Sequence, residues 1–135
     1  MATLHPAIEV PDSRFIDFAK AGEAQLLADN AATHQVVLGR ATTADWRSVD
    51  LSRHKAMASV VGKLDRDGVG SNVLGDPRLA LTWLANELSG LGITLAAGQV
   101  VITGTCAPPL PIGPGDRLHM DFGAFGTVGA TLAVE

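Results

Sequence analysis

The sequence has almost no cysteine, which excludes two kinds of stabilising site. Cys106 is the single cysteine among 135 residues, so neither an internal disulfide framework nor a multi-cysteine zinc site can form. This scarcity suits a reducing compartment, and we expect the protein to be cytoplasmic. Cys106 could act as a nucleophile, but no histidine or lysine is near it in the sequence. The pattern instead favours a small buried hydrophobic residue at this position.

Long apolar runs and an excess of positive charge are also missing. No apolar run approaches the ~20 residues that a transmembrane helix needs, and the first segment, MATLHPAIEV, lacks the charged and continuous apolar regions of a signal peptide. The 10 Lys and Arg residues against 14 Asp and Glu give a net charge of −4 without a basic stripe. We therefore expect neither a membrane nor a nucleic-acid partner.

What is present indicates one globular domain over residues 1–135. The length fits a single domain, and a composition of 47% hydrophobic and 18% charged residues is globular, not disordered. The chain starts almost inside the strand-like run 7–10, and a start of this kind is one that we expect of a fragment or a split subunit.

Hydrophobic periodicity predicts two helices. Residues 15–30 show a helical apolar pattern that Gly22 weakens near its centre. The second helix is expected over residues 77–89, with Asp76 as its N-cap and Pro77 in its first turn. Its predicted apolar face comprises Leu79, Trp83, Leu84, Leu88 and Leu91.

Apolar runs bounded by Gly, Pro and Asp predict the strands. They are expected over residues 7–10, 35–38, 55–64, 69–73, 99–103, 117–122 and 126–133. Tight turns are predicted at 65–68, where an Asp-Gly pair suits a positive φ, and at 114–116, after a proline-rich loop. The sum is an α+β fold, in which about two helices lie on a mostly antiparallel sheet.

Glu9 lies between two apolar residues in the first predicted strand. A carboxylate there is either solvated or held by a cation, because burying it unpaired costs several kcal/mol. The pattern by itself favours the solvated reading. Asp12 follows Pro11 and suits a turn. Arg14 could be a carboxylate-binding fork or an ion-pair partner of Asp12.

Other polar patterns carry weaker signals. The segment 103–106 ends a predicted strand, where Gly104 permits close approach of a ligand and the flanking hydroxyls can donate hydrogen bonds; a plain strand end is the alternative. The four histidines share no metal-ligand spacing, so no zinc site is expected, although His34 could approach a pocket. The glycine-rich segment 68–75 lacks the Lys-Ser/Thr of a phosphate-binding loop.

Five stretches in this order resemble the 2-keto-4-pentenoate hydratase / 4-oxalocrotonate decarboxylase family, within the fumarylacetoacetate hydrolase-like superfamily. They are HPAIEVPDSR (5–14), ADNAATHQVVLG (28–39), GSNVLGDPRLALTWLANELSGLG (70–92), ITLAAGQVVITGTC (93–106) and IGPGDRLHMDFGAFGTVGATL (112–132). The resemblance covers nearly the whole chain and implies that it corresponds to the second half of the family fold.

The fold that the resemblance implies is a β-rich mixed roll or barrel with about two flanking helices, in a homo-oligomer. The implied reaction, part of aromatic catabolism, adds water to 2-hydroxypenta-2,4-dienoate or removes CO₂ from a vinylogous 2-oxo acid. The substrate is therefore a small 2-oxo or 2-hydroxy carboxylic acid. In both reactions a Mg²⁺ or Mn²⁺ ion chelated by the acid stabilises a dienolate.

The resemblance also implies the site residues. Glu9 matches the third of three acidic metal ligands, the other two of which lie on an E-x-E strand. The segment 103–105 matches a strand end that lines the substrate pocket, and 29–30 match a pocket-side segment. Arg14 would orient Glu9 or meet the substrate carboxylate. The substrate-binding residues expected on this basis are Thr103, Gly104, Thr105, Asn30, Asp29 and Arg14.

The sequence departs from the family in one large respect. It contains no E-x-E, and it lacks the family's catalytic lysine and acid, so its catalytic residues are not identified. The nearest acids, in Asp65-Arg66-Asp67, are predicted to lie in a hairpin turn. The chain is then a part or separately encoded half of a hydratase or decarboxylase, completed by a complementary chain, or a non-catalytic oligomeric module.

A third function, hydrolysis of a C–C bond in acylpyruvates, is disfavoured by the stretches DNAATHQVVLG and GDPRLALTWLANEL. Half of a roll leaves strand edges and core surface uncovered. We therefore expect the protein not to be a monomer.

Overall fold

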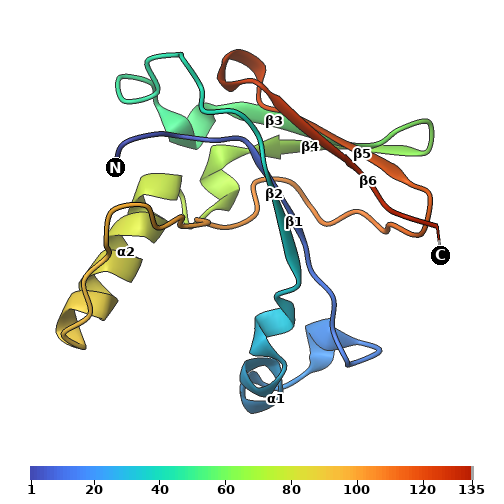
Figure 1. The fold of residues 1–135 in the computed structure, drawn as a ribbon, viewed down its shortest axis with the longest axis horizontal. Coiled ribbons are helices and arrows are strands. Elements are labelled where there is room, and N and C mark those ends of the chain that lie inside the picture. Colours follow the sequence, from blue (N-terminus) through green and yellow to red (C-terminus); the bar gives the residue numbers. More distant parts are fainter. Residues whose placement is uncertain (135) are drawn as a thin grey trace.

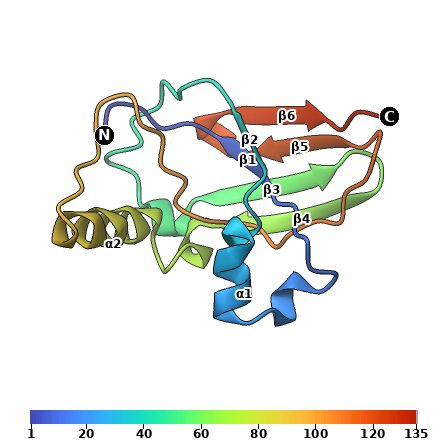
Figure 2. The ribbon, with the colours of Figure 1, turned by 60° about the horizontal axis from the view of Figure 1, so that its bottom comes forward.

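The computed structural model describes residues 1–134, apart from the side chain of Ala19, as two β-sheets and two α-helices (Figure 1). The larger sheet is antiparallel with the strand order β4–β3–β5–β6, and the smaller pairs β1 with β2. The strands are β1 (Ala7–Val10), β2 (Gln35–Leu38), β3 (Lys55–Val60), β4 (Leu64–Val69), β5 (Arg117–Asp121) and β6 (Thr127–Thr131). Figure 2 shows the four strands of the larger sheet side by side.

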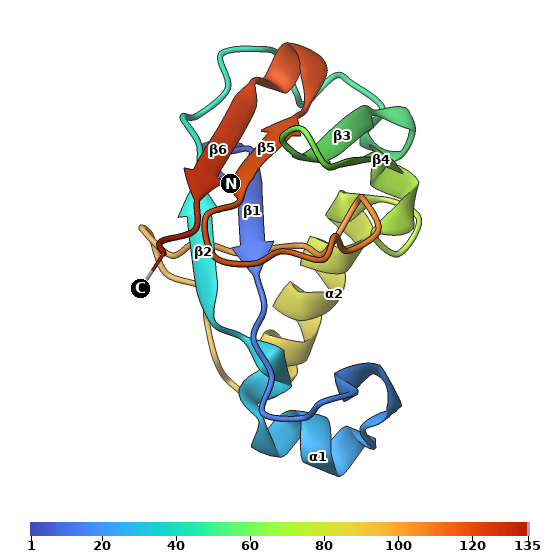
Figure 3. The ribbon, with the colours of Figure 1, turned by 90° about the vertical axis from the view of Figure 1, so that its right-hand side faces the viewer.

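Both α-helices project from the same side of the four-stranded sheet (Figures 1 and 3). They are α1 (Glu23–Ala28) and α2 (Pro77–Gly90), and short 3-10 turns occur at η1 (Phe18–Lys20), η2 (Asn30–Ala32), η3 (Leu51–Arg53), η4 (Gly70–Asn72) and η5 (Gly123–Phe125). α2 begins as predicted, because the Asp76 carboxylate accepts a hydrogen bond from the Arg78 backbone N–H at 2.8 Å. Within residues 1–134, neither helix has the length and apolar character to traverse a bilayer.

The main core lies between the two sheets. Ile8 of β1 packs against Val60, Leu118 and Val128 of the larger sheet, and all four are buried. Val60 is 1% exposed, and burying such a side chain stabilises the fold by roughly 1.5–3 kcal/mol. The alternation in β3 follows the prediction, since Ala56, Ala58 and Val60 face inward and the residues between them do not. The two sheets are thus held together through β1.

The predicted helix over 15–30 is wrong. Only Glu23–Ala28 is α-helical, with η1 and η2 on either side. Ala21 has ψ 141° and Gly22 has ψ 164°, so the backbone is extended where the helix was expected to continue. Gly22 explains the break, because glycine loses more conformational freedom in a helix than any other residue.

The predicted hairpin turn at 65–68 is also misplaced. The turn falls at Val61–Lys63, where Gly62 takes a φ of +76°, and residues 65–68 lie inside β4. Gly68 is instead required by packing: a Cβ there would lie 2.7 Å from the carbonyl oxygen of Cys106. The strand predicted over 69–73 correspondingly ends at Val69, and η4 follows.

No strand forms at 99–103, contrary to the prediction. The segment 93–116 has no regular structure, and no described segment forms a strand ladder with it. It returns alongside α2 and then crosses beneath the larger sheet to β5 (Figure 1, orange). The apolar residues that suggested a strand stay exposed, with Val100 at 62% and Ile102 at 41%. The last two strands agree with the prediction to within a few residues.

The apolar face predicted for α2 is mostly uncovered. Ala80 is the one residue of α2 classed as buried in the described structure, whereas Leu79, Trp83 and Leu91 are 58%, 59% and 75% exposed. A helix with this much uncovered apolar surface favours contact with another layer of protein.

We predict opposite effects for two glycine substitutions. In Gly70→Ala the new Cβ would collide with the Leu51 carbonyl group, so the free energy of unfolding should fall by about 1–3 kcal/mol. In Gly90→Ala nothing lies within 4 Å of the new Cβ at the end of α2, so the free energy of unfolding should rise by up to about 1 kcal/mol. Urea denaturation measures both, and a stable Gly70→Ala variant would contradict the packing at η4.

We further predict acid sensitivity at an ion pair between the buried Asp116 and the exposed Lys63. Asp116, 7% exposed, accepts hydrogen bonds from Lys63 Nζ at 2.5 Å and from the Gly113 N–H at 3.0 Å, and the lysine contact is the main cause that lowers its pKa. A lowered native pKa means that the stabilisation is complete above the ordinary aspartate value of about 3.9 and is lost as pH falls through the native pKa.

Asp116→Asn should therefore lower the melting temperature at pH 7 and flatten its decrease between about pH 5 and 2. The exposed Asp65, which forms no ion pair in the described structure, provides the control Asp65→Asn. An equal loss of melting temperature in both variants would contradict a specific role for the pair.

Candidate functional site

A large cavity of ≈ 1460 Å³, here called the groove, lies on the helical side of the larger sheet. Its walls come from β1, from α2 and from the segment 95–107. The insertion between β1 and β2, residues 11–34, is here called the flap; it carries α1 and contributes Phe18, Leu26 and Ala31 to the lining. Most of the lining is apolar, so the few polar groups in it determine what the groove can bind.

Glu9 is one of these polar groups, and strand alternation places it. Its neighbour Ile8 is buried against the larger sheet, so Glu9 faces the opposite side of the β1–β2 ladder. Its cross-strand partner is Val36, which is 40% exposed, and Leu38 on the same face is 44% exposed. Glu9 itself is exposed, lines the groove, and forms no ion pair with any described residue. A free carboxylate thus stands on an uncovered apolar surface.

The segment 103–105 lines the groove. Gly104 has a φ of +122°, a conformation that residues with a Cβ rarely adopt, and a Cβ there would also approach Val73 Cγ1 at 3.2 Å. The segment is anchored at its end, because the Cys106 carbonyl accepts hydrogen bonds from the Val69 N–H at 3.0 Å and from Asn72 Nδ2 at 2.8 Å.

Cys106 is half-buried in the groove wall. Burial raises the pKa of its thiol, which keeps the sulfur protonated and weakly nucleophilic at neutral pH. This environment agrees with the hydrophobic role that the sequence favoured.

The expected pocket residues Asp29, Asn30 and Arg14 are not among the described residues that line the groove. Asp29 is 3% exposed and accepts hydrogen bonds from Ser13 Oγ and Arg14 Nη1, both at 2.6 Å, and from the Arg14 N–H at 3.2 Å. The Ser13 hydrogen bond is the largest cause that lowers the pKa of Asp29. Arg14 pairs with Asp29 and not with Asp12, which corrects the ion pair considered from the sequence.

The groove instead receives Ala31 and Ala32 from this part of the chain. Asn30, Ala31 and Ala32 all have positive φ, at 52°, 53° and 57°. Asparagine tolerates this left-handed region, and Asn30 was the one available signal. Alanine gives no such signal, so the sequence could not predict that these two residues form the pocket side.

Two of the three histidines in the described lining of the groove, His5 and His54 but not His119, are already engaged. His5 Nδ1 lies 2.9 Å from the Gly39 carbonyl oxygen, and His54 Nε2 lies 2.7 Å from that of Phe122. The His54 ring also stacks on Phe125 with centroids 4.0 Å apart. His34 is exposed and lies outside the lining given by the described residues.

The fit of this site to a divalent cation is incomplete. A carboxylate oxygen is the kind of donor that Mg²⁺ prefers, and Glu9 supplies one. Residues 1–134 contain no group of three or more His, Cys, Asp or Glu side chains placed to hold a metal ion. The described residues therefore do not form a complete metal site, and Glu9 is the one carboxylate among those that line the groove.

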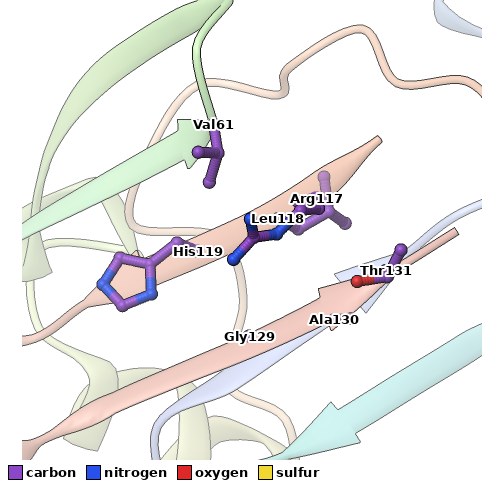
Figure 4. A pocket seen from close by; sticks show the side chains of 7 residues that line it. All are labelled: Val61, Arg117, Leu118, His119, Gly129, Ala130 and Thr131. Atoms are coloured by element: carbon purple, nitrogen blue, oxygen red, sulfur yellow. The ribbon is translucent and has the colours of Figure 1, made fainter. Parts of the chain in front are cut away.

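A smaller hollow of ≈ 410 Å³ lies on β5 and β6 near the β3–β4 turn (Figure 4). Arg117 and His119 extend from β5, and Gly129, opposite His119, leaves the space. The described residues that line it include Arg117 and His119 but no carboxylate.

Comparisons with known proteins identify relatives over most of the chain. The chain is 38% identical to 2-hydroxyhexa-2,4-dienoate hydratase of Comamonas testosteroni and 34% identical to 2-keto-4-pentenoate hydratase of Paraburkholderia xenovorans, covering 90% and 91% of this chain but 46% and 45% of those proteins.

A solved structure of 4-oxalocrotonate decarboxylase from Pseudomonas putida G7, complexed with magnesium and adipate, matches with a TM-score of 0.82 and 32% identity. The match covers 95% of this chain and 48% of that one. It confirms the expected fold class, and the chain spans about half the length of the curated relatives it matches.

Residues 4–133 match the fumarylacetoacetate (FAA) hydrolase C-terminal family. The match takes in most of the residues that line the groove, including Glu9 and the segment 103–105. The chain belongs to the FAA hydrolase C-terminal family and corresponds to the C-terminal half of the 2-keto-4-pentenoate hydratases and 4-oxalocrotonate decarboxylases.

Proposed function

We propose that this chain supplies one half of the active site of a hydratase that adds water to 2-oxo acids of the 2-hydroxypenta-2,4-dienoate type with the help of a divalent metal. The observation that carries the proposal is Glu9, a free carboxylate on an uncovered apolar face that also lines the groove. The hydratase relatives, which are up to 38% identical to this chain over the aligned residues, support the reaction class.

The metal is proposed to be Mg²⁺, with Mn²⁺ as a substitute of similar chemistry. One similar structure is complexed with magnesium and adipate and another with calcium and acetate, so in both a divalent cation accompanies a carboxylic acid. Glu9 is the oxygen ligand that this chain would contribute. When bound, such an ion supplies a Lewis acid that stabilises negative charge on the substrate oxygens.

The remaining ligands have to come from outside the described residues. Neither Asp65 nor Asp67 serves, because both lie in β4 and neither lines the groove. We infer that a complementary polypeptide segment bearing paired acids covers the face of Glu9, Val36 and Leu38. The exposed apolar residues of α2 would be covered by the same segment or by a second copy of the chain.

Other residues of this chain have roles that follow from their positions. The hydroxyls of Thr103 and Thr105 can donate hydrogen bonds to the substrate carboxylate. Leu81 and Ala85 of α2 give the groove an apolar wall, which would exclude water from around the hydrocarbon part of the acid. The catalytic proton donor is not assigned to any of these residues.

Two alternative functions follow from specific observations. The relatives include decarboxylases at about 30% identity, such as 4-oxalocrotonate decarboxylase of Pseudomonas putida at 31%, and decarboxylation of a related 2-oxo acid could use the same metal corner. A non-catalytic oligomeric module is the second alternative, favoured by the incomplete set of metal ligands. A cytoplasmic location and a homo-oligomeric state also remain predictions.

The assignment of Glu9 predicts the effect of removing its charge. The chain would be combined with the part of the Comamonas testosteroni hydratase that the sequence match does not cover, and Mn²⁺ binding would be titrated by electron paramagnetic resonance. Glu9→Gln should weaken binding by about tenfold or more, because a neutral amide is a poorer ligand for a hard cation. The control Glu23→Gln, on the exposed surface of α1, should bind as the unaltered chain does.

Unchanged Mn²⁺ binding in Glu9→Gln would exclude this residue as a ligand. Absence of Mn²⁺ binding by the combined polypeptides, when their association is confirmed by size-exclusion chromatography, would count against the metal-dependent function and favour the non-catalytic module.

The uncovered surfaces predict self-association when no complementary segment is present. Exposed apolar residues on α2 and on the β1–β2 face should drive the isolated chain to dimers or larger species. Static light scattering at micromolar concentration measures the mass, and a sharp monomeric peak would contradict the prediction.

A further inference from the structure

The two ends of the flap meet where residues 12–14 lie beside residues 29–32, and we call this place the neck. A set of contacts that we call the clasp closes it. The Asp29 carboxylate accepts hydrogen bonds from Ser13 Oγ and Arg14 Nη1, both at 2.6 Å, and from the Arg14 N–H, which is shared between its two oxygens at 3.2 and 3.4 Å. Beside it, the Asp12 N–H donates to the Ala32 carbonyl at 2.9 Å. These contacts join the chain just after β1 to the chain just before β2, and so they close a loop that contains η1 and α1.

The turn inside the clasp is strained. Asn30, Ala31 and Ala32 follow one another with positive φ, and for residues other than glycine this conformation brings Cβ too close to the following carbonyl oxygen. Three such residues in succession persist only when surrounding contacts hold them. The internal hydrogen bonds of the turn, from the Ala32 N–H to the Asp29 carbonyl at 3.1 Å and from the Thr33 N–H to that of Asn30 at 3.0 Å, are short-range. The clasp is the contact that reaches across the neck.

The strained turn has a place in the groove. Ala31 and Ala32 line it, as do Phe18 and Leu26 from the rest of the flap. Glu9 lies in β1, whose ladder with β2 ends at Val10 and Gln35, immediately before the clasp. If the neck opened, the wall made by the flap and the end of the ladder beside Glu9 would move together.

We propose that Asp29 is a positioning residue of the site: its carboxylate binds no ligand but holds the left-handed turn 30–32, and with it the flap, against the groove. Asp29 is 3% exposed, its carboxylate is engaged by two side chains and one backbone N–H, and it is not among the described residues that line the groove. The importance of Asp29 for catalysis rests on the proposed function, whereas its role in holding the turn does not depend on that function.

The test uses amide hydrogen exchange of the whole chain, followed residue by residue by NMR, without metal or substrate. Asp29→Asn keeps the size of the side chain but removes its charge. It should speed exchange at the Asp12, Ala32 and Thr33 amides by about tenfold or more, because a charge-assisted hydrogen bond in a locally opening unit is lost. Exchange at the Val61 amide, which bonds to the Arg117 carbonyl in the larger sheet, should not change.

A second substitution distinguishes holding the turn from general stabilisation. Ala31→Gly removes the cost of the positive φ, since glycine adopts this region freely. When Ala31→Gly is added to Asp29→Asn, the exchange rates at the same three amides should fall about threefold below those of the single variant. The matched control Ala24→Gly, the same exchange within the right-handed helix α1, should recover none. Asp17→Asn, which removes a charge from the exposed Lys20 pair of the flap, should leave the three amides unchanged.

Several results would overturn the proposal. They are unchanged exchange at the three amides in Asp29→Asn, an equal acceleration at Val61, or no recovery on adding Ala31→Gly. These exchange measurements contain no metal, so their outcome is independent of the Mn²⁺ titration. If protection of the three amides depends on Asp29 but the titration shows no Mn²⁺ binding, the clasp stands and only the metal site is rejected.

Discussion

The packing of Ile8 against the larger sheet is the interaction on which the rest of the site depends. Successive residues of a strand face opposite sides, so burying Ile8 beside Val60 and Leu118 sends Glu9 to the other face of β1. The register of β1 with β2 then surrounds Glu9 with Val36 and Leu38. A shift of one residue would bury the carboxylate and expose the isoleucine, which is why hydrophobic burial fixes the position of this charge.

The same architecture explains why the described structure leaves so much apolar surface uncovered. One face of the β1–β2 ladder is used for the core, and the other remains an apolar surface around one carboxylate. α2 has a similar imbalance, with Ala80 buried and Leu79 and Trp83 exposed. The relatives that this chain matches are about twice as long. A second layer of protein that brings further acids would cover the apolar surface and complete the ligand set at once.

The sequence predicted correctly those elements whose ends are set by neighbouring residues in the chain. α2 begins at an Asp-Pro pair whose N-cap hydrogen bond forms as expected, and β1 and β2 have the predicted bounds. The failures involve long-range contacts. Gly68 suggested a turn but is needed for close packing on Cys106, and the apolar run 99–103 lacks a described strand to pair with.

The site was predictable only in part for a similar reason. The family resemblance singled out Glu9 and the segment 103–105, and these residues line the groove, while their roles there stay predictions. Asp29 is buried in an ion pair with Arg14, and the sequence cannot show that these two residues satisfy each other across the flap. The positive φ of Ala31 and Ala32 has no signature in the residue types, because the surrounding contacts impose it.

The central claim is that Glu9 is one corner of a metal site that another polypeptide segment completes. The most direct test is a crystal structure of the complemented assembly grown with Mn²⁺, with the ion located by its anomalous scattering. The account predicts an anomalous peak at coordination distance from the Glu9 carboxylate, with at least one further acid from the complementary segment. A Mn²⁺ ion bound elsewhere, with Glu9 facing solvent in the assembled protein, would contradict it.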